Sequence, residues 1–148
     1  MSREILFKAK RIDNGEWVEG YVFDDGFADS KRLFVGGLVI MDYKGTADDR
    51  WNVGTDFYEV NPDTLCQYTG LTDKNGNKIW ENDVVECKND ESHFQSQIEW
   101  DKSYCGFILQ DSDTSAVGLD AITKGGIYKD VQVIGNIFDN PELIECEV

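Results

Sequence analysis

The chain has 148 residues, and its 29 Asp and Glu residues against 14 Lys and Arg residues give a formal net charge of −15. Such a surface repels phosphate groups, so direct binding to DNA, to RNA or to anionic membranes is disfavoured. The hydrophobic fraction of 41%, with 12% aromatic residues, excludes a disordered chain and predicts one compact domain or two small β units that share an interface.

The four cysteines predict a reducing environment. They are Cys66, Cys87, Cys105 and Cys146. They are widely spaced and form no C-x-x-C motif, unlike the cysteines of a disulfide framework or a zinc site. No stretch approaches the roughly 20 apolar residues that span a bilayer, and the first residues lack a secretory apolar region. We therefore expect a cytoplasmic protein whose cysteines are mostly small buried hydrophobes.

The N-terminal part predicts paired strands. Residues 4–10 and 17–23 read as two strands around the turn signal Asp13-Asn14-Gly15, which is typical of a β-hairpin. Residues 33–41 form the most apolar run, with glycines at 36 and 37. This run predicts either one buried strand or two strands broken at the glycines by a bulge or turn.

A polar segment separates this run from the next strand. Residues 42–56 are rich in Gly and Asp and predict an exposed loop, and residues 57–60 predict a short strand. Asn61 followed by Pro62 is typical of a helix start, with Asn as the N-cap. The helix is limited to about one turn because β-like sequence resumes at Tyr68.

The second half predicts a series of short strands. The segment 73–77 contains Asn75-Gly76, which favours a tight type I′ hairpin turn. Residues 94–100 alternate in polarity and would place Phe94, Ser96, Ile98 and Trp100 on one face. The expected strands follow the spacing of a small barrel or rolled sheet from about residue 70 onward; they are 78–80, 83–88, 94–100, 105–110 and 131–138, before a terminal turn at 140–141.

Three segments of this sequence resemble the YopX family, whose members occur in phages and prophages of Gram-positive bacteria. The segments are R-E-I-L-F-K-A-K to W-V-E-G-Y at 3–21, Y-E-V-N-P-D-T-L-C-Q-Y-T-G-L-T-D-K-N-G-N-K-I-W-E-N-D-V-V at 58–85, and V-I-G-N-I-F-D-N-P-E-L at 133–143. Asn82 stands where family members usually have Gly, and Asn tolerates the positive φ that such a turn needs.

The resemblance implies a mainly β fold with only short helical turns. An N-terminal β-hairpin or β-rich region would occupy residues 1–69, and an SH3-like small β-barrel would occupy residues 70–148. The resemblance also suggests a homo-oligomer in the cytoplasm of a bacterial host. It implies no enzymatic activity and no cofactor.

The candidate catalytic and metal-binding residues are few. His93 is the single histidine, and it could act as a general base beside Cys87 or Ser92, but we interpret it as an exposed loop residue. Two stretches, 73–77 and 111–115, begin like calcium loops but lack the Gly and Glu that an EF-hand requires. We therefore expect no catalytic residue, no metal site and no cofactor.

The aromatic residues give a weak indication of a binding site. Aromatics can line a peptide groove, as in SH3 domains, although most of them fill the core of a small barrel. The segment that most resembles the family contains a predicted turn whose flanking residues are the candidate binding site: Tyr68, Trp80, Glu81 and Asp83.

These features favour a phage or prophage protein that acts as a non-enzymatic, homo-oligomeric binding or assembly module. Its expected partners are copies of itself and a host or phage protein. One alternative is an inhibitor that mimics nucleic acid, which predicts a contiguous acidic stripe and a salt-sensitive complex with a basic host protein. The other is an enzyme with a cryptic carboxylate or cysteine site, which predicts a concave pocket that contains His93 or a perturbed carboxylate.

Overall fold

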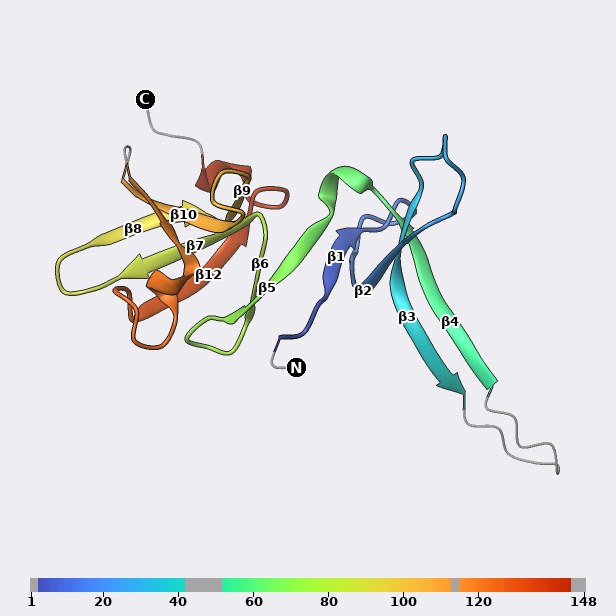
Figure 1. Cartoon of the computed structure of the whole chain (residues 1–148), viewed down its shortest axis with the longest axis horizontal. Coiled ribbons are helices and arrows are strands. Elements are labelled where there is room, and N and C mark those ends of the chain that lie inside the picture. Colours follow the sequence, from blue (N-terminus) through green and yellow to red (C-terminus); the bar gives the residue numbers. More distant parts are fainter. Residues whose placement is uncertain (1–2, 42–51, 113–114, 145–148) are drawn as a thin grey trace. The chain divides into compact units, whose positions relative to one another are not determined.

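The computed structural model describes residues 3–41, 52–112 and 115–144 (Figure 1). The fold is mainly β, and the helical parts described are short 3-10 turns, as expected. The chain divides into two compact units, Ile5–Cys66 and Met1–Glu4 with Gln67–Val148. No helix in the described ranges is long and apolar enough to cross a membrane.

The N-terminal unit is built on four antiparallel strands, in which each strand pairs with the next along the chain. The strands are β1 (Phe7–Lys10), β2 (Trp17–Asp24), β3 (Leu33–Met41) and β4 (Asn52–Val60). The predicted hairpin is confirmed, with Lys10 opposite Trp17 at its closed end. Alternate residues of this sheet pack on Ala9, Val35 and Val60, which are fully buried.

Residues 33–41 form one continuous strand, so the first of the two alternatives for this run is correct. Its Gly36 is required by close packing of the backbone. A Cβ at Gly36 would collide with the carbonyl oxygen of Asp56, and a Cβ at Gly20 would collide with the carbonyl oxygen of Gly36. The glycine lets three strands approach one another without breaking β3.

The predicted loop at 42–56 is wrong over its last part. Residues 42–51 lie outside the described residues, but β4 begins at Asn52 and continues without interruption to Val60. Its pairing with β3 runs from Leu33 opposite Val60 to Met41 opposite Asn52. This ladder satisfies the backbone groups of a polar stretch whose side-chain pattern does not indicate a strand.

The predicted helix start is confirmed. The side chain of Asn61 accepts a hydrogen bond from the backbone N–H of Asp63 at 3.0 Å, and Pro62 occupies the first position of the 3-10 helix η1 (Pro62–Thr64). The hydroxyl of Thr64 accepts a hydrogen bond from the N–H of Lys10 at 2.9 Å. This bond fixes the turn against β1.

The C-terminal unit contains two three-stranded antiparallel sheets and a shorter strand pair. The sheets have the orders β12-β7-β8 and β11-β10-β9. Their strands are β7 (Asp83–Lys88), β8 (His93–Gln97), β9 (Glu99–Asp101), β10 (Gly106–Ser112), β11 (Ser115–Gly118) and β12 (Asp130–Asn136). The remaining elements are β5 (Cys66–Thr72), β6 (Lys78–Trp80), and the 3-10 helices η2 (Leu119–Ile122) and η3 (Pro141–Leu143). The sheets are open, and closure into an SH3-like barrel stays a prediction.

The strand predicted at 94–100 is divided in two by Ile98. The N–H of Ile98 donates to the carbonyl of Asp83 at 2.8 Å, and its carbonyl accepts from Asn82 at 2.8 Å. Ile98 is fully buried, while Trp100 beyond the division is 49% exposed. The core of this unit gathers around Ile98; it includes Ile79, Val85, Cys87, Leu109, Ala121, Tyr128 and Val131.

The turn at 73–77 is not the predicted type I′ turn. Gly76 has a φ of +82°, but Asn75 is not among the described residues with positive φ. The N–H of Gly76 donates to the carbonyl of Asp73 at 3.0 Å, and the N–H of Asp73 donates to the carbonyl of Asn77 at 2.8 Å. This is the pattern of a type I turn followed by a bulge with glycine in the left-handed region.

The carboxylate of Asp73 explains the difference. It accepts backbone hydrogen bonds from Asn75 and Asn77 at 2.9 Å each, and from Val133 of β12 at 3.0 Å. The side chain is only 7% exposed. Burial raises the pKa of Asp73, but the hydrogen bonds from Val133, Asn77 and Asn75 together hold it below its usual value.

Replacing Asp73 with Asn should lower the free energy of unfolding by about 2–4 kcal/mol, because an amide loses charge-assisted bonds and turns an N–H₂ group toward N–H donors. The loss should be largest near neutral pH. Since the folded pKa is lowered, the carboxylate stabilises the fold above its unfolded pKa, and this contribution disappears as the pH falls through the folded pKa. Urea unfolding at several pH values measures both effects.

The matched control is Asp130→Asn, which removes a nearby exposed ion pair with Lys74. It should cost at most about 1 kcal/mol. Equal losses for the two variants would show that the buried bonds of Asp73 do not organise this turn.

Candidate binding site

The structure brings Tyr68 and Trp80 together inside the C-terminal unit. The two residues lie opposite each other in the β5–β6 pair, and their ring centroids are 5.4 Å apart at an interplanar angle of 48°. Tyr68 is 6% exposed and Trp80 is 4% exposed. Burial of this kind means that the two rings contribute to the packing of the unit and present little surface to a ligand.

Asp83 closes the turn that follows Trp80. Its carboxylate accepts the backbone N–H of Trp80 at 2.9 Å, and its side chain is 2% exposed. Asn82 between them has a φ of +68°, which confirms that Asn can occupy the expected left-handed position. The carbonyl of Asn82 also accepts from Ile137 at 3.1 Å, so the turn anchors the segment after β12.

Glu81 is the most accessible acid of this turn. Its side chain is partly buried, and its carboxylate accepts the N–H of Gln67 at 3.2 Å. Burial raises the pKa of Glu81, and the bond from Gln67 offsets this only in part. A half-buried carboxylate with a raised pKa can accept a hydrogen bond or hold a proton. Of the four predicted binding residues, Glu81 is therefore the one that a ligand could best reach.

The left-handed conformation at Asn82 predicts a specific order of stability. Asn82→Ala should be less stable than Asn82→Gly by about 1–2 kcal/mol, because alanine pays the steric penalty of positive φ. Both variants lose the same side-chain hydrogen bond from Gln97 to Asn82, at 3.1 Å, so their difference isolates the backbone effect. Thermal unfolding measures it. Equal stability of the two variants would contradict the proposed strain.

His93 and Cys87 lie on opposite faces of the β7–β8 pair. Cys87 is paired with Phe94 and is fully buried, whereas His93 is paired with Lys88. Burial, followed by the charge of Glu86, raises the pKa of the Cys87 thiol to about 12, so this thiol is protonated at neutral pH. His93 therefore cannot activate Cys87. It is exposed as expected, but it begins strand β8 and does not lie in a loop.

His93 contacts the carboxylate of Glu86. This carboxylate lies 2.9 Å from the amine of Lys88 and 3.1 Å from Nε2 of His93. Hydrogen bonds from Lys88 and then from His93 lower the pKa of Glu86 to about 2. The cluster is a surface ion-pair network on the outward face of the β7–β8 hairpin.

Lys88→Ala should raise the pKa of Glu86 toward its ordinary value of 4.5, and it should do so more than His93→Ala, because Lys88 makes the larger contribution. Since the folded pKa is lowered, this carboxylate favours the folded state above the unfolded pKa and ceases to do so as the pH falls toward about 2. Carboxyl NMR titration gives the values. Lys74→Ala, whose amine pairs with Asp130, serves as the control and should leave Glu86 unchanged.

A shallow depression borders this hairpin. It has a volume of about 410 Å³ and is lined by Lys88, Asn89, Asp90, Glu91, Ile127, Lys129 and Asp130. His93 is not among its lining residues. Within the described residues, no group of three or more His, Cys, Asp or Glu side chains is placed to hold a metal ion. The calcium-like start at Asp73 is occupied by backbone N–H donors, and residues 113–114 of the second stretch lie outside the description.

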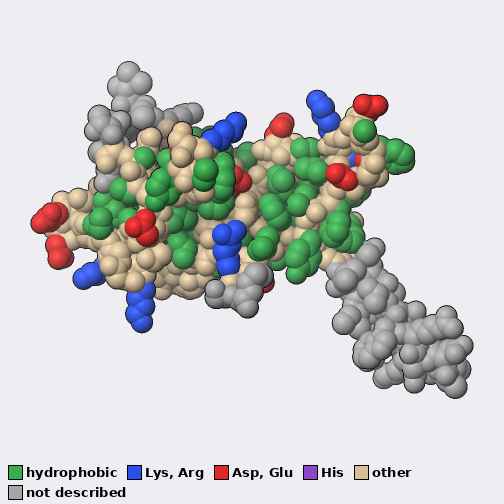
Figure 2. All heavy atoms as spheres, viewed as in Figure 1, with side chains coloured by type: hydrophobic (Ala, Val, Ile, Leu, Met, Phe, Trp, Pro, Cys, Tyr) green, Lys and Arg blue, Asp and Glu red, His purple; other side chains and the backbone are tan. Residues whose placement is uncertain are grey.

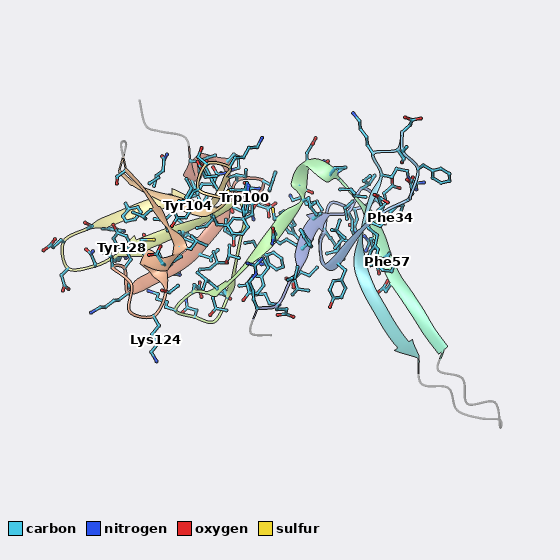
Figure 3. The ribbon with its side chains drawn as sticks, in the orientation of Figure 1. Phe34, Phe57, Trp100, Tyr104, Lys124 and Tyr128 are labelled. Carbon is cyan, nitrogen blue, oxygen red and sulfur yellow. The ribbon has the colours of Figure 1, made fainter. Side chains whose placement is uncertain are left out.

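The outward face of the N-terminal sheet carries aromatic residues that sequence reasoning did not select as a site. Tyr21 and Phe23 of β2 are 56% and 49% exposed, and Phe27 in the next loop is 75% exposed. Phe34 of β3 is paired with Phe23, and the rings of Phe23 and Phe57 of β4 are only 4.7 Å apart (Figure 3). We call the four strand residues Tyr21, Phe23, Phe34 and Phe57 the aromatic face. The alternation of Val18 and Val22 with Tyr21 and Phe23 could have revealed it.

Figure 2 shows hydrophobic side chains gathered on this unit and acidic side chains scattered over the face in view. Exposed apolar patches of this kind mark interaction sites on folded proteins. The fold is therefore that of a mainly β protein with exposed aromatic side chains on one sheet face.

The comparisons place the chain in a family. The profile of the YopX protein family matches residues 7–145, and the chain belongs to this family. A crystal structure of protein EF1440 from Enterococcus faecalis is similar, with 25% identity and a TM-score of 0.59. The match covers 97% of this chain and 99% of that chain. No curated protein matches the sequence.

Proposed function

We propose that this chain is a phage or prophage protein that works in the bacterial cytoplasm as a non-enzymatic, homo-oligomeric binding or assembly module. The observation that carries the proposal is the aromatic face, in which Tyr21 and Phe23 are large and exposed. Aromatic residues are enriched in protein–protein interfaces because they bury much area with few rotatable bonds. Copies of the chain, or a host or phage protein, would cover this face.

The edge of the same sheet supports self-association. Strand β4 is nine residues long and is the outermost strand in the sheet order of the described residues. Proline in an edge strand hinders pairing with other chains, and β4 contains no proline. A second chain could extend the sheet at β4 while its side chains cover the aromatic face.

The SH3-like nature of the C-terminal unit is part of the proposal. The division at Ile98 lets one continuous segment contribute β8 to one sheet and β9 to the other. The two sheets share a common core around Leu109 and Val85. This arrangement supports a rolled sheet of the SH3 type as a rigid module that positions binding surfaces.

The oligomer is tested by light scattering of the purified full chain over a range of concentrations. We expect the wild-type mass to be a multiple of the chain mass. The double variant Tyr21→Ser, Phe23→Ser should dissociate into monomers at concentrations at which the wild-type chain is still oligomeric. Removing two aromatic anchors from an interface typically costs several kcal/mol. Ile127→Ser is the matched control, because Ile127 is 62% exposed in the other unit.

A wild-type protein that stays monomeric at every concentration would contradict the homo-oligomer. Unchanged mass in the double variant, with oligomeric wild type, would show that another surface makes the contact. Circular dichroism of each variant establishes that the sheet still folds.

A further inference from the structure

The loop between β9 and β10 holds one tyrosine in a fixed position. Asp101 pairs with Gly106 across the hairpin, and the carboxylate of Asp101 accepts the backbone N–H of Tyr104 at 2.7 Å. Cys105 has a φ of +55°, and its thiol lies 3.3 Å from the carbonyl of Lys102. These local bonds turn the Tyr104 side chain back over the sheet.

The ring of Tyr104 lies on a platform of two glycines. A Cβ at Gly106 would be 3.4 Å from Cδ1 of Tyr104, and a Cβ at Gly118 would overlap the tyrosine hydroxyl. One edge or face of the ring therefore rests where side chains of β10 and β11 would otherwise stand. Tyr104 is nevertheless 60% exposed, so the rest of the ring faces solvent.

One carboxylate lies next to this ring, and a second projects from the same sheet face. A Cβ at Gly118 would also be 2.8 Å from Oδ1 of Asp120, which places this carboxylate beside the tyrosine hydroxyl. Glu99 is paired with Ile108, and Ile108 is paired with Gly118, so Glu99 projects from the same sheet face. Among the ion pairs of the described residues, neither Glu99 nor Asp120 takes part in one.

Trp100 is not part of this surface. It is paired with Phe107, its ring packs edge-on against that of Phe107 at 5.1 Å, and the register places both on the opposite face of the sheet from Glu99 and Ile108. The outer face therefore offers one aromatic ring rather than a broad apolar patch. Ile108 beside it is only 8% exposed. A purely apolar partner would find little to bury here.

We propose that the outer face of β9–β10–β11 binds a basic peptide segment of a partner protein, with an Arg or Lys side chain over Tyr104 and between Glu99 and Asp120. A cation is attracted to the face of an aromatic ring, and carboxylates accept its N–H donors. Charge complementarity selects this occupant, because the exposed carboxylates of Glu99 and Asp120 attract a basic segment and repel an acidic one. The surface is distinct from the aromatic face and does not depend on the homo-oligomer.

The probe is a fluorescein-labelled peptide of alternating Arg and Ser, and the comparison peptide has Gln in place of each Arg. Fluorescence anisotropy with the full chain measures Kd at low and near-physiological salt. We expect binding of the Arg peptide that weakens with salt, and no binding of the Gln peptide. Absence of Arg-peptide binding, or equal binding of both peptides, would overturn the proposal.

The matched variants separate a local site from bulk charge. Asp120→Asn and Glu142→Gln each remove one negative charge, but Glu142 lies in η3 and is not part of the β9–β10–β11 sheet. Asp120→Asn should weaken binding about threefold to tenfold, and Glu142→Gln should change it little. Equal effects of the two variants would show attraction by net charge alone and would overturn the site.

Tyr104→Leu tests the ring. Leucine keeps an apolar side chain over Gly106 but removes the face of the aromatic ring, so the thermal midpoint should stay close to wild type while Kd rises about threefold to tenfold. Tyr104→Phe keeps the ring and should bind almost as wild type. Wild-type affinity in Tyr104→Leu would overturn the role of the ring, and a loss that is shared equally by Tyr104→Phe would place the interaction on the hydroxyl instead.

Discussion

The C-terminal unit depends on the hydrogen bonds between Ile98 and the turn at 82–83. Ile98 donates to Asp83 and accepts from Asn82, and Asn82 in turn accepts from Ile137. Three distant segments thus meet at one residue in the left-handed region. The carboxylate of Asp83 completes the corner by holding the N–H of Trp80. The segment that most resembles the family therefore forms a corner of the fold. A ligand could bind there only through the groups of this segment that are not buried.

Local signals predicted what local chemistry determines. The N-terminal hairpin, the Asn61 cap with Pro62, and the tolerance of Asn82 for positive φ each depend on residues within a few positions of one another. Turn and capping residues act through their own backbone, so a single sequence suffices to identify them. Three short segments also sufficed to indicate the family, and the family model matches residues 7–145.

Three errors in the predicted elements involve pairing or hydrogen-bond partners elsewhere in the sequence. The start of β4 is set by its pairing with β3, and no side-chain pattern in 52–56 indicates it. The type of the 73–77 turn is decided in part by a bond from Val133, 60 residues later. The division of the strand at Ile98 follows from its bonds to Asn82 and Asp83. Sequence periodicity carries no record of such contacts, so these features needed the structure.

The same distinction explains which aromatic residues are available for binding. Tyr68 faces Trp80 across its strand pair and is buried, whereas Tyr21 faces Gly36 and is exposed. Tyr104 likewise lies over Gly106 and Gly118. In these cases a ring opposite glycine rests on the backbone and keeps its other side in solvent. The residue across the sheet is not the sole determinant, because Phe23 is paired with Phe34 and is still 49% exposed. The glycines opposite Tyr21 and beneath Tyr104 leave room for these rings at the surfaces that we propose for binding.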